Sequence, residues 1–366
     1  MPSTPLSAAD LADRLASGEA MTILDVRDET NGEIDAPSAT LVHEPASRVL
    51  ADPARRLNGL AEPVVVVCNR GRTAEPVAAA LGDLSVDALV LQGGIREWIG
   101  MLQARPVDLG LAGTEVVQIQ RPGRGCLSYL VSSGGEALVV DPAPDAAFYL
   151  AQAQRRGARI THVVDTHLHA DHLSGARDLA RLSGAALHLP APALERGLTY
   201  EVDPLRDGDV LRVGDVEIRA LALPGHTTDM TGLVVAGRAL ISGDSLFADG
   251  FARPDLEKGD PEGAGAMART LHATIHERIL PLGDDLVLLP GHTHAGVSAV
   301  AIAPTLAQVR EAVPELSIQD AGRFADELVA AMPPRPANYE AVIAVNAGTA
   351  PFDPELEVGG NSCATR

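Results

Sequence analysis

The sequence predicts an α/β protein of two domains: a parallel sheet wrapped by helices, followed by a sandwich of two helix-covered sheets. The chain has 366 residues, more than a single hydrophobic core usually organises. Over the first hundred residues, apolar runs alternate with helical patterns, as is typical of a parallel sheet. From about residue 115 there are several strand patterns for each helix. We expect a first domain at residues 1–105, a second at 114–345 and a C-terminal tail at 346–366.

The first domain is predicted from strands and helices that follow one another in turn. The segment SAADLADRLAS spaces its apolar residues as a helix does. The runs at 21–27 (MTILDVR) and 63–68 (PVVVVC) are typical of buried strands. The next pattern is helical, with Pro76 in its first turn, where proline is tolerated. Residues 103–113 are predicted to be a linker.

The second domain is predicted to hold more strands than helices. Its strand patterns are CLSYLVSS, EALVVDP, RITHVVDT, VEIRALALPGH, TGLVVAGRALISGD and DLVLLPGH. Its helical patterns are FYLAQAQRRGA, SGARDLARLSG and PEGAGAMARTLHATIHERIL. The residues that end the chain are rich in Pro and Gly, and we expect them to be loosely docked.

Composition narrows the class of protein. Hydrophobic residues make up 46% and charged residues 21%, as in an ordinary globular protein. The net charge of −20 disfavours nucleic acid and anionic membranes as partners. We expect no membrane span and no signal peptide. Three cysteines in a long chain do not suggest a disulfide framework, so we expect a cytoplasmic location; a homodimer stays open.

Seven side chains of metal-ligand type follow predicted strands of the second domain. They are His167, His169, Asp171, His172, His226, Asp244 and His292. Loops after strand ends gather at one edge of a sheet, where open α/β folds place their sites. Imidazole and carboxylate donors suit Zn, Fe or Mn. The pattern therefore predicts a metal site and leaves open whether it holds one ion or two.

The order of these residues resembles the metallo-β-lactamase fold superfamily over about residues 115–295. The shared pattern is His-x-His-x-Asp-His, then Pro-Gly-His, Gly-Asp and a last Pro-Gly-His. The resemblance implies an αββα sandwich with metal at its edge. The flanking segments GCLSYLV, THLHADHLSGAR, ALPGHTTDMTGL and SGDSLFADGFARPDL are similar to the persulfide dioxygenases. That family oxidises a low-molecular-weight thiol persulfide with O₂ to sulfite and thiol, using one Fe(II) per chain.

This resemblance implies roles for individual residues. The iron ligands would be His167, His226 and Asp244, a facial triad that leaves positions open for the persulfide sulfur and O₂. His169, Asp171, His172 and His292 would orient these ligands or contact the substrate. Arg253, beside Asp255, would support the site or pair with a substrate carboxylate; the alternative for Arg253 is a surface ion pair.

The same seven residues also fit a second reading. In a thioester hydrolase resembling glyoxalase II, two Zn(II) ions per chain would be bound. Asp244 would bridge them, and His169, Asp171, His172 and His292 would supply ligands for the second metal. The motif by itself does not choose between the two readings.

The three cysteines differ in context. Cys68 ends a strand and precedes a glycine-containing loop and a helix, so backbone amides and the helix N-terminus favour a thiolate or persulfide there. Arg70 and Arg72 add positive charge. Cys126 is predicted to be a core residue and Cys363 to be incidental.

With ILDVR and LQGGIREW, the loop CNRGRT makes residues 1–105 resemble a rhodanese domain, which carries sulfane sulfur on its cysteine. In the usual loop the arginine stands five residues after the cysteine, whereas here Arg72 comes one place earlier. The alternative is a non-catalytic interaction module. A sulfur carrier joined to an oxidising site would raise the local concentration of a shared persulfide. The sequence does not specify the thiol, which could be glutathione, coenzyme A or another small thiol.

Overall fold

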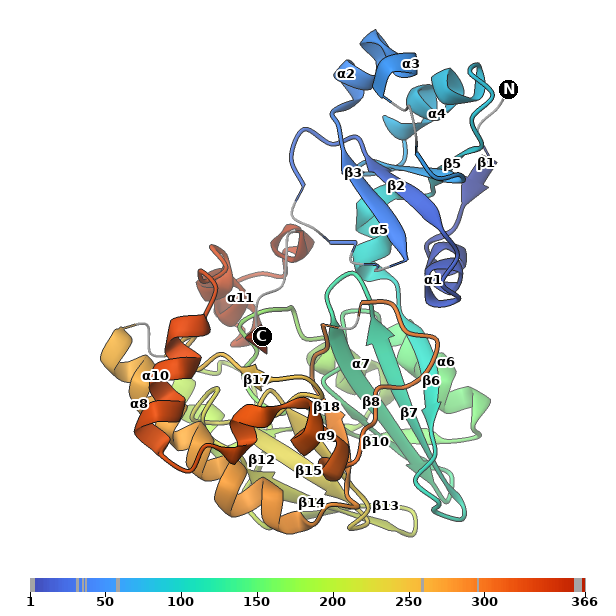
Figure 1. Cartoon of the computed structure of the whole chain (residues 1–366). Coiled ribbons are helices and arrows are strands. Elements are labelled where there is room, and N and C mark those ends of the chain that lie inside the picture. Colours follow the sequence, from blue (N-terminus) through green and yellow to red (C-terminus); the bar gives the residue numbers. More distant parts are fainter. Residues whose placement is uncertain are drawn as a thin grey trace.

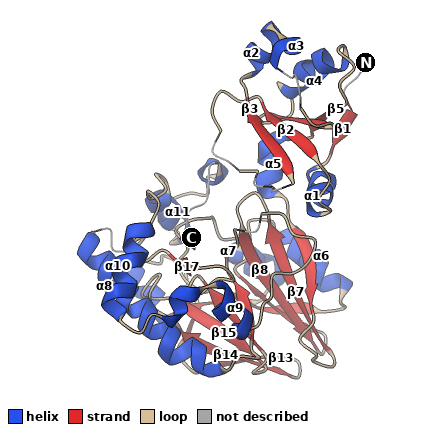
Figure 2. Cartoon of the chain, in the orientation of Figure 1, coloured by secondary structure: helices blue, strands red, loops and turns tan. Residues whose placement is uncertain are grey.

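The protein consists of two sheet-based units that contact each other along one side (Figures 1 and 2). The computed structural model describes residues 4–30, 33–34, 36, 38–56, 60–257, 260–294, 296–358 and 364–365. Cys363 lies outside the described residues. Among the helices in the described ranges, none combines the length and apolar character needed to cross a membrane.

The first unit is a parallel sheet in the order β1-β5-β4-β2-β3. Its strands are β1 (Thr4–Leu6), β2 (Met21–Asp25), β3 (Ala39–His43), β4 (Val64–Val67) and β5 (Ala88–Leu91). Its helices are α1 (Ala8–Ala16), α2 (Ala46–Ala51), α3 (Pro53–Arg56), α4 (Ala74–Gly82) and α5 (Gly94–Gly100). Pro76 stands in the first turn of α4, as predicted.

The central strand β4 shows why this sheet has helices on both faces. Val64 and Val66 pack with residues of α2 and α4, whereas Val65 and Val67 pack with residues of α1 and α5. Successive side chains of a strand point to opposite faces, so four consecutive valines need a cover on each side.

The second unit contains two facing sheets. The first has the order β12-β11-β10-β9-β8-β7-β6, and the second has the order β13-β14-β15-β16-β18. The strands of the first sheet are β6 (Gln103–Val107), β7 (Thr114–Arg121), β8 (Cys126–Ser133), β9 (Glu136–Val140), β10 (Arg159–Val164), β11 (Ala186–Pro190) and β12 (Asp203–Leu205). Those of the second are β13 (Val210–Val213), β14 (Val216–Ala222), β15 (Thr231–Val235), β16 (Ala239–Gly243) and β18 (Val287–Pro290). A short pair joins β17 (Phe251–Ala252) to β19 (Ala364–Thr365).

Helices cover the outer faces of both sheets. The helices of this unit are α6 (Ala146–Arg155), α7 (Ala176–Ser183), α8 (Pro261–Thr274), α9 (Leu306–Ala312), α10 (Ala321–Ala331) and α11 (Tyr339–Asn346). Short helical turns are η1 (Ala191–Arg196), η2 (Ile275–Ile279), η3 (Leu280–Leu282), η4 (Pro314–Ser317) and η5 (Pro354–Glu357). In β9, Leu138 and Val140 face the other sheet, whereas Ala137 and Val139 pack with α6 and α7. Because α8, α9 and α10 pack on the second sheet, the layers are αββα.

Two sequence predictions need correction. Part of the predicted linker at 103–113 is the strand β6, which pairs antiparallel with β7 of the second unit; its residues alternate too weakly in hydrophobicity to show this beforehand. The C-terminal tail is not loosely docked over residues 346–358. Asn346 and Glu357 are both buried and bonded to other parts of the chain.

Candidate metal centre

The predicted ligands lie where strands of both sheets end. His167, His169, Asp171 and His172 follow β10, and the remaining three follow β14, β16 and β18. The loops meet at one edge of the sandwich, and the seven side chains form overlapping clusters. The structure therefore brings together every ligand-type residue that the sequence analysis selected.

Three of these side chains point unsatisfied atoms at one another. His167, His226 and Asp244 each offer one ligand atom within 4.8 Å of the others, and His226 Nε2 lies 3.8 Å from Asp244 Oδ2. The three residues are 0%, 0% and 1% exposed, and within the described part of the chain His167 Nε2, His226 Nε2 and Asp244 Oδ2 have no hydrogen-bond partner. A buried polar atom without a partner costs about 1–3 kcal/mol. Three such atoms in one place fit a bound cation.

The opposite atom of each of these groups is held by a hydrogen bond. His226 Nδ1 donates to the carbonyl of Arg253 at 2.7 Å. His167 Nδ1 lies 3.0 Å from Thr166 Oγ1, whose hydroxyl donates to Asp141. Asp244 Oδ1 accepts from His292 Nδ1 at 2.8 Å. These partners leave each Nε2 and Oδ2 free for a metal, the arrangement that outer partners of metal ligands usually impose.

The charge state of His167 also suits a metal ligand. Burial, followed by the neighbouring His169 and His226, lowers the pKa of His167 well below its usual value. The imidazole is therefore neutral near pH 7, and a neutral imidazole is the form that binds metal.

A second cluster lies beside the first. Its members are Cys126, Asp171, His172 and His292, with ligand atoms within 4.8 Å of one another. His172 Nδ1 donates to Asp171 Oδ2 at 2.9 Å. His292 Nε2 lies 2.8 Å from the same oxygen, as an ion-pair contact rather than an aligned hydrogen bond.

Cys126 was missed as a site residue. Burial alone would raise the pKa of its thiol, but His172 and His292 lower that pKa to about 6. The residue is buried, as predicted, but its neighbours are polar. The strand pattern around Cys126 shows only that it is buried; its backbone bridge to His292, 166 positions away, arises from the fold.

His169 belongs between the two clusters. Its Nε2 donates to Asp141 Oδ1 at 3.1 Å, and its Nδ1 has no hydrogen-bond partner. It also forms a cluster with His167 and Asp171. His169 can therefore contribute a further ligand if a second ion is bound.

Arg253 is buried and bonded to other groups of the protein. The residue is 0% exposed, and its guanidinium binds both carboxylate oxygens of Asp255, at 2.7 and 3.1 Å, and the carbonyls of Pro333 and Pro334. The guanidinium is bonded to groups of the protein itself, and its ion pair with Asp255 is buried rather than at the surface. The pairing with a substrate carboxylate stays a prediction. The predicted supporting role fits, since the Arg253 carbonyl orients His226.

The Cys68 loop lies in the first unit. Cys68 follows β4 and is 3% exposed, and its carbonyl accepts from the amide of Ile95 in α5 at 2.8 Å. The side chain of Thr73, the N-cap residue of α4, makes no capping hydrogen bond to the residues that the structure describes. Arg70 and Arg72 are exposed on the same loop.

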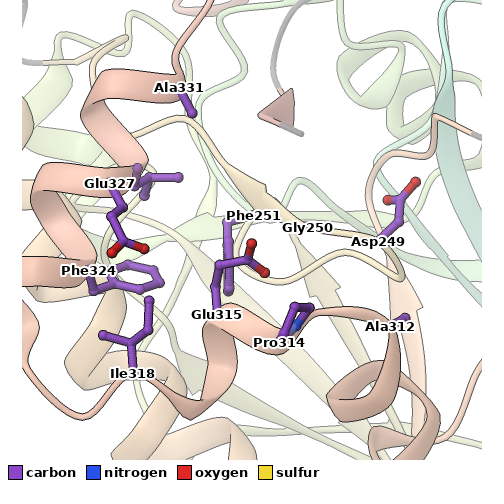
Figure 3. Close-up of a pocket in the computed structure, with 11 residues that line it drawn as sticks. Asp249, Gly250, Phe251, Ala312, Pro314, Glu315, Ile318, Phe324, Glu327 and Ala331 are labelled. Atoms are coloured by element: carbon purple, nitrogen blue, oxygen red, sulfur yellow. The ribbon is translucent and has the colours of Figure 1, made fainter.

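A separate cavity of about 230 Å³ lies next to β17 (Figure 3). Phe251 and Phe324, whose rings meet edge to face, line this cavity together with Glu315 and Glu327. The candidate metal ligands are absent from its lining within the described ranges. This cavity is therefore distinct from the metal centre.

Comparison with known proteins agrees with this geometry. Residues 121–295 match the metallo-beta-lactamase superfamily, and residues 7–101 match the rhodanese-like domain. A hydroxyacylglutathione hydrolase of Acidiphilium cryptum is 30% identical over 210 residues, covering 56% of this chain and 83% of the hydrolase. The chain belongs to the metallo-beta-lactamase superfamily. It carries a rhodanese-like domain ahead of the superfamily domain, so both predicted resemblances and the predicted fold class are confirmed.

Other members of the superfamily are similar to this chain over the same region. The human persulfide dioxygenase ETHE1, mitochondrial, is 30% identical over 180 residues. That alignment covers 46% of this chain and 63% of the dioxygenase. A metallo-beta-lactamase structure from Staphylococcus aureus superposes with a TM-score of 0.61 at 25% identity, covering 66% of this chain and 75% of that one. Both the fold and the donor set of this superfamily enzyme support a metal cofactor.

Proposed function

We propose that the protein is a persulfide dioxygenase with one Fe(II) held by His167, His226 and Asp244. The observation that carries this proposal is the convergence of three buried, unpartnered atoms from two imidazoles and one carboxylate. This donor set is typical of non-haem Fe(II) oxygenases, which keep positions open for substrate and O₂. The rhodanese-like domain adds a second link to sulfane sulfur.

The overall reaction would be RSSH + O₂ + H₂O → RSH + H₂SO₃, in which the outer sulfur is oxidised and O₂ is reduced. Bound iron would pass electrons from the sulfur to O₂ and would provide the open positions that this chemistry needs. The protein's own residues hold the ligands: Thr166, the Arg253 carbonyl and His292 fix the orientation of the two imidazoles and the carboxylate. The ligand side chains are buried, and shielding from bulk water strengthens their electrostatic attraction to a bound ion.

In the one-metal reading, His292 orients Asp244. Its Nδ1 is used on Asp244 Oδ1, which keeps that oxygen engaged and directs Oδ2 to the first site. Asp171 in turn lies beside both His172 and His292. In this reading the second cluster orients the ligands and holds protons next to the substrate.

A second candidate function is a two-zinc thioester hydrolase. The cluster of Cys126, Asp171, His172 and His292 favours it, because all four residue types are zinc ligands. The similarity to a hydroxyacylglutathione hydrolase points the same way. In this reading Asp244 would bridge the metals, and His169 would add to the ligand set.

The experiment that separates these functions is metal analysis of protein purified without added metal, together with an oxygen electrode. We expect about one iron per chain, and O₂ consumption on addition of glutathione persulfide. Two zincs per chain without O₂ consumption would instead support the hydrolase. Removal of iron by a chelator should abolish the O₂ consumption, and Fe(II) should restore it.

We further propose that Cys68 carries sulfane sulfur. Its thiolate would attack the outer sulfur of a donor, form a Cys68 persulfide and release the remaining thiol or sulfite. The N-terminus of α4 and the charges of Arg70 and Arg72 would stabilise the anion.

A further inference from the structure

A buried polar network ties the ligand loop to the C-terminal segment. The loop, residues 165–175, contains neither helix nor strand, so its backbone groups need partners elsewhere. Asn346, at the end of α11, is 6% exposed. Its Nδ2 donates to the carbonyls of His169 and His172 at 3.0 and 2.8 Å, and its Oδ1 accepts from the amide of Ser174 at 2.9 Å.

Glu357 makes a second attachment to the same loop. Its Oε1 accepts from the amide of Leu173 at 2.9 Å. Its carboxylate also pairs with the guanidinium of Arg121, at 2.9 and 2.5 Å, and both side chains are buried. Arg124 adds hydrogen bonds to the carbonyls of Glu357 and Asp171. The backbone on both sides of Asp171 is thus held from outside the loop.

The same network reaches the rhodanese-like domain. Arg121 Nε donates to the carbonyl of Ile99 in α5 at 2.7 Å. At its other end, α5 binds the Cys68 carbonyl through the amide of Ile95. An exposed pair between Arg96 and Glu355 lies alongside, but exposed pairs contribute little. Figure 1 shows the red C-terminal part of the chain next to both units.

We propose that Asn346 and the Arg121–Glu357 pair are positioning residues that hold the metal-ligand loop and couple it to α5 of the rhodanese-like domain. They act through the backbone of residues 169–174, not by touching metal or substrate. Breaking a buried ion pair leaves an uncompensated charge next to the loop, so the loop geometry depends on the pair. The inference rests on the proposed metal centre, but it holds for iron and zinc alike.

The test is a Co²⁺ titration of the full-length, metal-free chain, read from the d–d absorption bands. We expect Asn346→Asp and Glu357→Ala to weaken Co²⁺ binding about 10–100-fold and to change the band positions, as loss of outer partners does. Asn346→Asp keeps the size of the side chain and the oxygen that accepts from the Ser174 amide. It removes the two hydrogen bonds that Nδ2 donates to the carbonyls of His169 and His172. Glu357→Gln keeps an acceptor for the Leu173 amide and should restore part of the affinity.

Gln319→Ala is the control, because Gln319 is an exposed amide side chain that donates to the nearby Ser317 carbonyl, away from the ligand loop and from Glu357. Its Co²⁺ affinity should stay within about twofold of the parent. Circular dichroism checks that each variant is folded. Parent-like affinity and bands in folded Asn346→Asp and folded Glu357→Ala would overturn the positioning role. A parent protein that binds no Co²⁺ would overturn the metal centre as well, so the two failures are distinguishable.

Hydrogen–deuterium exchange tests the coupling to α5. We expect Co²⁺ to slow amide exchange in residues 94–100 of the parent chain and to have no such effect in Glu357→Ala. Equal Co²⁺-dependent protection of α5 in both proteins would show that the pair does not link the two domains.

Discussion

At the scale of single residues, the position of Asp244 depends on glycines on both sides of its carboxylate. Gly243 directly precedes it and has φ of +49°, a conformation that side chains disfavour. Gly291 lies across from it, and a Cβ at that position would come within 2.4 Å of Asp244 Oδ1 and 3.0 Å of the Gly243 backbone. The close approach of β16 and β18 therefore requires a residue without a side chain at 291.

We predict that Gly291→Ala weakens metal binding by at least about 10-fold, because the added methyl group displaces the Asp244 carboxylate. Co²⁺ titration measures the change. Gly82→Ala is the control, since a Cβ there meets open space at an ordinary backbone angle. Unchanged affinity in Gly291→Ala would mean that Asp244 is not a ligand or that the strands can separate freely.

At the scale of elements, the two sheets are joined by polar as well as apolar contacts. Tyr129 of β8 is fully buried, donates to the carbonyl of Pro290 in β18 at 2.6 Å, and accepts from Gln118 at 3.1 Å. Burial raises the pKa of Tyr129 well above its usual value, so the phenol stays protonated and can donate. Pro290 is the last residue of β18, and His292 follows it two residues later. The bond from Tyr129 therefore also helps to fix the position of His292.

We predict that Tyr129→Phe lowers the free energy of unfolding by about 1–3 kcal/mol, because the Pro290 carbonyl and the Gln118 amide lose a buried partner. Urea unfolding followed by circular dichroism measures the loss. For comparison, Tyr339→Phe removes a hydroxyl bonded to the exposed Glu340, and should change stability by less than about 0.5 kcal/mol. Equal effects of both substitutions would contradict a special role for the bond between sheets.

At the scale of the whole molecule, two domains associated with different chemistry share one chain and a buried contact. Gly123, between β7 and β8, lies so close to α5 that a Cβ would meet the backbone of Trp98 and Ile99 at 2.8 Å. Linking a sulfur carrier to an oxidising centre raises the effective concentration of their shared intermediate if the geometry lets both sites take part.

We predict that Cys68→Ser lowers sulfur transfer from thiosulfate to cyanide at least about 100-fold, as loss of a nucleophile does. The metal content of the variant should match that of the parent, because the cysteine lies in the other domain. The rate of sulfur transfer and the metal content are both measured on the full-length protein. Transfer that persists in Cys68→Ser would favour a non-catalytic interaction module.

Much of the centre could be predicted because its ligands carry a local signature. His167, His226 and Asp244 each follow an apolar run and a turn, and such patterns are read within a few residues. Cys126 and Asn346 carry no local sign of their role. Cys126 lies in an ordinary strand pattern, and Asn346 stands where the sequence predicts a loose tail, so their partners are known only once distant elements pack together.

For Arg253, the sequence predicted the location of the residue but not the partners of its side chain. Its sequence neighbourhood suggests an arginine near the site, which is true, but not that its guanidinium is enclosed by Asp255 and the carbonyls of Pro333 and Pro334. Eighty residues separate Arg253 from Pro333 along the chain. Exposure of a charged side chain depends on such distant segments and not on local periodicity.

The sequence by itself determined the parallel sheet of the first domain, the order of the loops that bear the candidate ligands and the chemical nature of the donors, since these follow from hydrophobic periodicity and residue type. Tertiary structure alone decided which nitrogen or oxygen of each ligand is left unpaired, that a thiol joins the second cluster, and that the C-terminal segment holds the ligand loop. The physical reason is that hydrogen-bond satisfaction in a buried site is a property of all the groups that pack around it, and these come from segments far apart in the chain.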